Sequence, residues 1–150
     1  MRLWHYKLIP VLPRAQLISQ LRENVAIAKA LYEKGTPNHI LVNKVTEYNY
    51  NEFYNYCWLV LNELKKRGYK YKQTTVDKIE LYLNGAEREK YNEEEPLFLL
   101  WHNERYLAQC YFNLQEKYDC GGITEKEWKL IVDYVTKINK YCTGFYFPKV

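Results

Sequence analysis

Residues 51–68 read NEFYNYCWLVLNELKKRG, and this stretch decides the fold. Apolar residues recur in it three and four positions apart and cover most of a helical circumference. They are Phe53, Cys57, Trp58, Val60, Leu61 and Leu64. Asn49 and Glu52 are spaced like a capping box, and Gly68 is typical of the position just past a helix end. The pattern predicts a helix over residues 51–67 that is the central, most buried helix.

The preceding stretch predicts another helix. Pro13 suits a first helical position and Gly35 suits its end. Five residues at helical spacing form its expected buried stripe: Ile18, Leu21, Val25, Ala28 and Tyr32. Four others are expected on a different, polar face: Gln16, Ser19, Gln20 and Glu23. We therefore expect Glu23 to be available to a cleft.

The rest of the chain also reads as helical. Residues 36–48 predict an irregular loop, 75–83 a short helix, and 96–101 either helix or buried extended chain. Asn103 is expected to cap a further helix, and Thr124 with Glu127 forms a capping box for the last one. The fold class predicted is all-α: a compact single-domain bundle of about four to five helices, with residues 1–150 as one domain.

Composition restricts the classes of protein to consider. The hydrophobic fraction of 47% suits a packed globule. The sequence has no run of about 18 apolar residues and no signal peptide, so we expect a cytoplasmic protein with no membrane partner. The cysteines are widely spaced and are expected to be free thiols: Cys57, Cys110, Cys120 and Cys142. The three histidines lack metal-ligand spacing, and no metal or other cofactor is expected.

The net charge of +4 permits an anionic partner without requiring one. Lys65, Lys66 and Arg67 belong to a basic, tyrosine-containing patch that continues to Lys72, whereas residues 87–95 are acidic. Two interpretations of Lys65, Lys66 and Arg67 remain open, because cations in a last helical turn also suit the helix dipole. They contact DNA phosphate, or they stabilise the helix end.

The amino terminus carries the candidate chemistry. Arg2 is too large for the usual removal of an initiator methionine, so we expect the α-amine of Met1 to be the mature terminus. A terminal amine titrates near pH ~7.7–8.0, so a substantial share of it can be an uncharged nucleophile at neutral pH. A carboxylate beside it would complete an amine-plus-acid pair for Schiff-base chemistry.

Three groups of residues carry a family resemblance. The first comprises Met1-Arg2-Leu3-Trp4-His5, Leu8-Ile9-Pro10, Leu12-Pro13-Arg14 and Arg22-Glu23. The second comprises Val45-Thr46, Asn51-Glu52-Phe53-Tyr54 and residues 61–69, and the third runs from His102 to Lys117. In their order and spacing, the sequence resembles the pyrimidine-dimer DNA glycosylase family, also called phage endonuclease V. The resemblance implies an all-helical, metal-free enzyme that bends DNA, extrudes a nucleotide and cleaves the glycosidic bond.

The resemblance also implies residue roles. The amine of Met1 would attack the sugar, and the resulting imine would permit β-elimination. Glu23 would stabilise the charge that develops on the sugar, with the terminus packed against the first helix. Arg2, Gln16, Arg22 and the aromatic Tyr146 of the tail would contact DNA. Phage members have a histidine in place of Gln16 and an arginine in place of Ala26.

Two functions from different classes fit these observations. The first is a DNA glycosylase with AP-lyase activity that acts as a monomer on double-stranded DNA with a pyrimidine dimer or another damaged or modified base. The alternative is a non-catalytic protein that sequesters nucleic acid or a small nucleotide ligand. The missing histidine and arginine favour the alternative, and the Arg22-Glu23 pair favours the enzyme. A helical protein-interaction module would explain the composition but not the opening residues.

Overall fold

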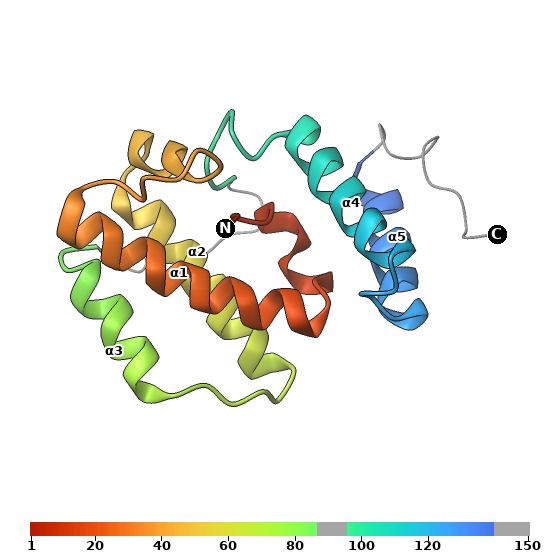
Figure 1. The fold of residues 1–150 in the computed structure, drawn as a ribbon, viewed down its shortest axis with the longest axis horizontal. Helices are drawn as coiled ribbons and strands as arrows, with labels where there is room; N and C mark the ends of the chain where they lie inside the picture. The colour runs from red at the N-terminus through yellow and green to blue at the C-terminus, as the bar shows by residue number, and fades with distance from the viewer. Residues whose placement is uncertain (87–95, 140–150) are drawn as a thin grey trace.

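A computed structural model describes residues 1–86 and 96–139, and this part of the chain contains helices and no strand (Figure 1). Five α-helices follow one another: α1 (Arg14–Lys34), α2 (Tyr50–Lys66), α3 (Gln73–Tyr82), α4 (Glu104–Asp119) and α5 (Glu125–Ile138). Two short 3-10 helices precede α1 and α2: η1 (Tyr6–Val11) and η2 (Asn43–Glu47). The prediction of an all-α bundle is confirmed.

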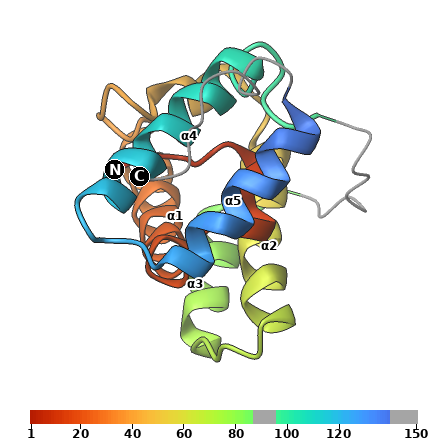
Figure 2. The ribbon, with the colours of Figure 1, turned by 90° about the vertical axis from the view of Figure 1, so that its right-hand side faces the viewer.

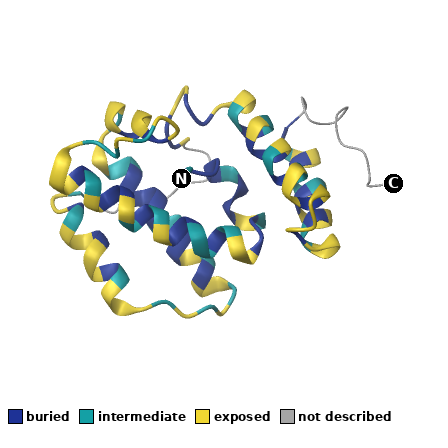
Figure 3. Cartoon of the chain, viewed as in Figure 1, coloured by how far each residue is buried: buried dark blue, intermediate teal, exposed yellow. Residues whose placement is uncertain are grey.

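The first twelve residues run between two groups of helices. Helix α1 packs against α2 and α3, and α4 packs against α5, while η1 contacts both α2 and α5 (Figures 1 and 2). Leu3, Leu8 and Leu12 are fully buried, and the N-terminal segment is among the most continuously buried parts of the chain (Figure 3). This confirms the expected packing of an ordered N-terminal segment against the first helices.

Helix α1 ends where the sequence predicts, but its buried face is different. Pro13 is its N-cap, and Gly35 takes a φ of 72° at the C-cap, where its N–H bonds Leu31 O at 3.0 Å. The predicted stripe is wrong at Tyr32, which is 59% exposed, and Gln20 is fully buried rather than on a polar face. The reason is that one side of α1 covers the N-terminal segment, whose backbone polar groups need buried partners.

Helix α2 is the central helix, with Phe53, Cys57 and Leu61 fully buried. Asn49 caps it by accepting a bond from the Asn51 N–H, but the Glu52 carboxylate accepts the Phe98 N–H at 2.9 Å instead of closing a capping box. Residues 96–101 form turns and are neither helix nor extended chain.

The last two helices begin where the sequence predicts. Asn103 caps α4 by accepting from the Tyr106 N–H, and Thr124 with Glu127 forms the predicted capping box of α5. None of the helices in the described residues has the length and apolar character needed to cross a membrane. The acidic residues 87–95 and the predicted contact Tyr146 lie outside the described residues.

Candidate active site around the N-terminal amine

An open cleft of about 370 Å³ lies where the N-terminal segment meets α1. Its walls come from this segment, α1, the loop before η2, and α4. The lining residues are Met1, Arg2, Trp4, Ala15, Gln16, Ser19, Glu23, Leu41, Asn113 and Lys117. The fold thus brings four of the predicted site residues together: Met1, Arg2, Gln16 and Glu23.

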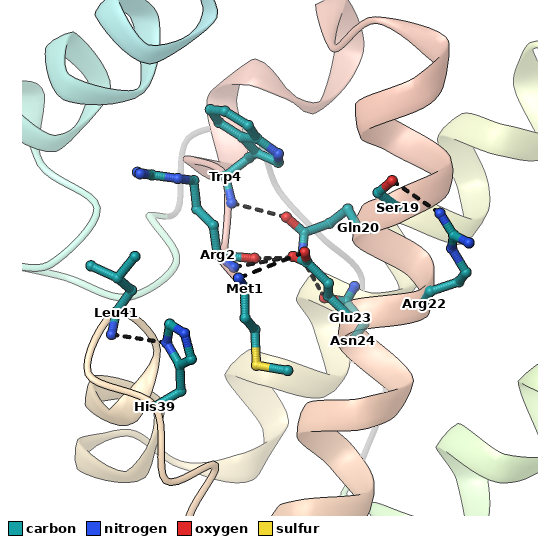
Figure 4. A network of polar contacts seen from close by, with 10 residues as sticks. All are labelled: Met1, Arg2, Trp4, Ser19, Gln20, Arg22, Glu23, Asn24, His39 and Leu41. Atoms are coloured by element: carbon teal, nitrogen blue, oxygen red, sulfur yellow. Dashed lines mark hydrogen bonds and ion pairs between the residues drawn. The ribbon is translucent and has the colours of Figure 1, made fainter.

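The terminal amine lies beside the Glu23 carboxylate (Figure 4). The nitrogen of Met1 is 4.0 Å from Oε1, and the backbone N–H of Arg2 donates to Oε2 at 3.1 Å. The side chains of Met1 and Glu23 are 28% and 31% exposed. The hydrogen bond from the Arg2 N–H therefore holds the neighbouring amine beside Glu23. Both groups remain open to a ligand in the cleft.

A buried glutamine holds the backbone that follows Met1, on either side of Leu3. The Gln20 Oε1 accepts the Trp4 N–H at 3.0 Å, and its Nε2 donates to Arg2 O and to Asn24 Oδ1, both at 2.9 Å (Figure 4). Gln20 and Asn24 are fully buried. Sequence reasoning missed both residues. The signal available was two amides four positions apart, which share one helix face with Leu17 and Leu21.

Further polar groups fix the segment beyond Arg2. The Tyr106 hydroxyl donates to Leu3 O at 2.6 Å, and the Tyr56 hydroxyl donates to Trp4 O at 2.7 Å. His102 Nδ1 accepts the Tyr6 N–H at 3.1 Å, and His5 Nε2 donates to His102 O at 2.9 Å. These bonds link the beginning of the chain to α2 and to α4 with its preceding turn.

The two histidines of this arrangement are neutral at pH 7. Burial lowers the pKa of His5 to about 4, and burial likewise holds the pKa of His102 well below its usual value. Lys7 donates its N–H to His5 Nδ1 at 3.1 Å, which leaves the proton of a neutral ring on the Nε2 that donates to His102 O. Both side chains hold the segment in place and lie outside the residues that line the cleft.

Cations outnumber carboxylates among the side chains that line the cleft. Arg2 and Lys117 contribute cations, and Glu23 is the one acidic side chain among the lining residues. The Arg2 guanidinium lies 5.2 Å from the centre of the Trp4 ring. Arg22 is exposed and donates to Ser19 Oγ at 3.2 Å, and it is not part of the lining. An anionic ligand is favoured by this arrangement.

Gln16 also lines this cleft, but its side-chain oxygen is enclosed by the protein. Its Oε1 is buried and has no hydrogen-bond partner among the described residues. A buried carbonyl oxygen without a partner is costly, by about 1–3 kcal/mol. A ligand in the cleft does not reach this oxygen in the conformation described.

The basic residues at the end of α2 lie elsewhere. Lys65 and Lys66 are exposed, and none of the three cations lines the cleft. The Arg67 guanidinium bonds Glu63 Oε1 at 2.8 Å, Leu12 O at 2.7 Å, Pro10 O at 3.1 Å and Ile9 O at 3.2 Å. Its donors are used to hold η1 and the chain after it.

Comparison with known proteins adds one match. A family model described as pyrimidine dimer DNA glycosylase matches residues 1–77, which include the N-terminal segment, α1, α2 and the start of α3. Met1 and Glu23 both lie within the matched residues. No curated protein and no solved structure matches the chain. Among the described residues, no three His, Cys, Asp or Glu side chains are grouped so that they could hold a metal ion.

Proposed function

Because this chain belongs to the pyrimidine dimer DNA glycosylase family, we propose that it is a DNA glycosylase with AP-lyase activity on pyrimidine dimers or other damaged bases. One observation carries the proposal: the terminal nitrogen lies 4.0 Å from the Glu23 carboxylate in an open cleft. An amine and an acid at this separation supply the nucleophile and the proton carrier that Schiff-base chemistry requires.

In the first stage, the terminal amine of the protein replaces the base on C1′ of the sugar. The uncharged amine of Met1 attacks C1′ of the deoxyribose while the C1′–N bond breaks, and the base leaves with the electron pair and takes up a proton. The amine loses its protons as the C1′–O4′ bond opens, O4′ becomes a hydroxyl, and a Schiff base joins Met1 N to C1′. The transition state is oxocarbenium-like, and the Glu23 carboxylate stabilises its positive charge.

The second stage cuts the strand. The imine nitrogen takes up a proton. Loss of a proton from C2′ then breaks the C3′–O bond and expels the 3′ phosphate by β-elimination, because the protonated imine accepts the electrons. Water then hydrolyses the imine and returns the free amine. In this proposal Glu23 carries the protons in these steps. This scheme requires no metal, so activity is expected to persist in EDTA.

The partner in this proposal is double-stranded DNA, bound by a monomer. Arg2, Gln16 and Arg22 are the proposed DNA contacts in and near the cleft, and Lys65 and Lys66 are proposed phosphate contacts outside it. Guanidinium and ammonium groups suit phosphate, and such contacts give salt-dependent affinity. The sugar carbon is inaccessible in a stacked duplex, so the reaction requires extrusion of a nucleotide.

Selective acetylation of the α-amine of Met1 tests the proposal, because it removes the proposed nucleophile and leaves the side chains proposed to contact DNA unchanged. Intact-mass analysis first establishes that Met1 is the terminus of the protein used. The untreated and acetylated proteins are then each incubated with borohydride and a duplex that contains a pyrimidine dimer or an abasic site. We expect a covalent adduct from the untreated protein and none from the acetylated protein, with DNA binding retained within a few-fold. Binding without an adduct in both samples would instead support the non-catalytic sequestering protein.

A further inference from the structure

Three exposed aliphatic side chains, called the ridge below, border the cleft: Ile40, Leu41 and Leu100. Ile40 and Leu100 are 87% and 82% exposed, and Leu41 is 50% exposed. The three side chains come from the loop before η2 and the turn before α4, and together they line a depression of about 240 Å³. Leu41 also lines the cleft that contains Met1 (Figure 4). Single exposed aliphatic residues are ordinary, but a group of three beside a candidate active site indicates a binding surface.

The backbone beneath the ridge is held firmly. Leu100 has a φ of 72°, a left-handed conformation that costs a leucine about 1–2 kcal/mol. Hydrogen bonds maintain it: Asn103 Nδ2 donates to Leu100 O at 3.0 Å, and the Tyr48 hydroxyl donates to Leu99 O. On the other loop, the His39 N–H donates to Asn43 Oδ1 at 2.8 Å. The turn thus presents a leucine to solvent at an energetic cost, which is a pattern found at functional sites.

The charges around the ridge indicate its partner. Lys44 and Arg105 line the depression, and Arg2 and Lys117 line the adjoining cleft. Across both linings Glu23 is the single carboxylate among the residues that the structure describes. Exposed aliphatic side chains surrounded by cations suit a polyanion with an apolar interior. Duplex DNA has this chemistry, whereas an apolar protein surface would not require the cations.

We propose that Ile40 and Leu100 form a wedge that enters the base stack at the lesion and separates neighbouring base pairs while a nucleotide leaves the duplex. Aliphatic side chains used in this way unstack base steps at a cost of a few kcal/mol, which the new protein contacts offset. Leu41 joins the wedge to the cleft, so the opened step lies next to the terminal amine. This inference rests on the proposed function and adds to it the groups that open the duplex.

The test compares two double variants on two substrates. Ile40→Ala with Leu100→Ala removes the wedge. The control variant, Leu81→Ala with Leu130→Ala, removes leucines of α3 and α5. They are 56% and 55% exposed and line neither the cleft nor the depression. The substrates are a duplex with a pyrimidine dimer, and a single strand with an abasic site, where no stack has to be opened. We expect the wedge variant to cleave the duplex about 10- to 100-fold more slowly and to cut the single strand at the wild-type rate within about 2-fold. The control variant should match the wild type on both.

Three results would overturn the wedge. The first is an unchanged rate on the duplex, and the second is an equal loss on both substrates, which would place the residues in the chemistry or in folding. The third is a wild-type protein that is a dimer in sedimentation equilibrium, together with a wedge variant that is a monomer and cleaves at the wild-type rate. That result would assign the ridge to an interface with a second copy of the chain.

A readout that needs no turnover separates the wedge from the proposed function. The duplex carries 2-aminopurine opposite the lesion, and its fluorescence rises when that base is unstacked. Wild-type protein is expected to raise the signal, and the wedge variant is not. A rise that depends on the wedge supports this inference even when no adduct forms, in which case only the proposed chemistry fails. Equal signals from both proteins overturn the wedge.

Discussion

Two regions of this molecule each contain an arginine, and the two guanidinium groups have different partners. In the cleft, Arg2 is half-buried with its guanidinium over Trp4, and its backbone is fixed by Glu23 and Gln20. At the end of α2, Arg67 directs its guanidinium to Glu63 and to three carbonyls of the chain before α1. The difference teaches that the partners around a cation decide whether it can bind DNA. Changes in the cleft should therefore affect turnover, and changes at Arg67 should affect stability.

The largest expected effect is that of Glu23→Gln. The amide keeps an oxygen for the Arg2 N–H but removes the charge beside the amine. We expect single-turnover cleavage to fall by about 10³-fold or more, with DNA affinity within a few-fold of wild type. The control is Glu33→Gln on the same helix, where the exposed carboxylate pairs with Lys29 at 3.9 Å and does not line the cleft. Unchanged cleavage by Glu23→Gln would refute the proposed role.

Gln20→Met should produce the next largest effect. Methionine has a similar size but cannot bond Trp4 N or Arg2 O, so the backbone that carries the amine loses two bonds and the amine is held less closely beside Glu23. A displacement of about 1 Å costs roughly 10²-fold in rate, so we expect that loss in the rate of adduct formation at saturating DNA, with the affinity unchanged. Asn55→Leu is the control, because it removes another buried amide that does not line the cleft. Equal losses in both variants would reduce Gln20 to a folding role.

Arg67→Met should lower stability rather than activity. The change leaves carbonyls of Ile9, Pro10 and Leu12 without a donor, and we expect a loss of about 2–3 kcal/mol in the free energy of unfolding in urea. Cleavage per folded molecule should stay within about 2-fold. Lys66→Met should leave stability within about 0.5 kcal/mol. It should instead lower the salt slope of DNA binding by about one, which Arg67→Met should not do. A reversed pattern would contradict the comparison.

The smallest expected effect concerns acid. The pKa of His5 is lowered to about 4 by burial, so between about pH 6.5 and 4 the unfolded chain binds more protons than the folded one. The contribution of this histidine to the free energy of unfolding is present above pH 6.5 and is lost as the pH falls toward 4. We expect about 2 kcal/mol less stability at pH 5 than at pH 7 from this residue. Urea unfolding of His5→Gln should show a correspondingly smaller acid loss, and His39→Gln should retain the wild-type loss.

Local signals in the sequence predict much of this fold. Pro13, Gly35, Asn103 and Thr124 mark helix ends through bonds made within a few residues, and the structure has them there. The role of Gln20 could not be read in the same way. A helical stripe drawn from apolar residues assumes an apolar neighbour, whereas α1 packs against a backbone segment that needs amide partners.

Contacts between residues far apart in the sequence also could not be predicted from local sequence patterns. Arg67 bonds carbonyls more than fifty positions earlier in the chain, and Tyr106 bonds one 103 positions away. Periodicity carries no information about such pairs. The resemblance of the opening residues did single out Met1 and Glu23, which lie together in the structure. Their roles in catalysis remain a prediction for experiment.

The most direct measurement is the site of the covalent bond. Protein trapped with borohydride on an abasic-site duplex is digested, and the peptides are sequenced by mass spectrometry. The account predicts that the deoxyribose remnant is attached to the α-nitrogen of Met1 in the wild type. Attachment to a lysine such as Lys117, with Met1 unmodified, would contradict it.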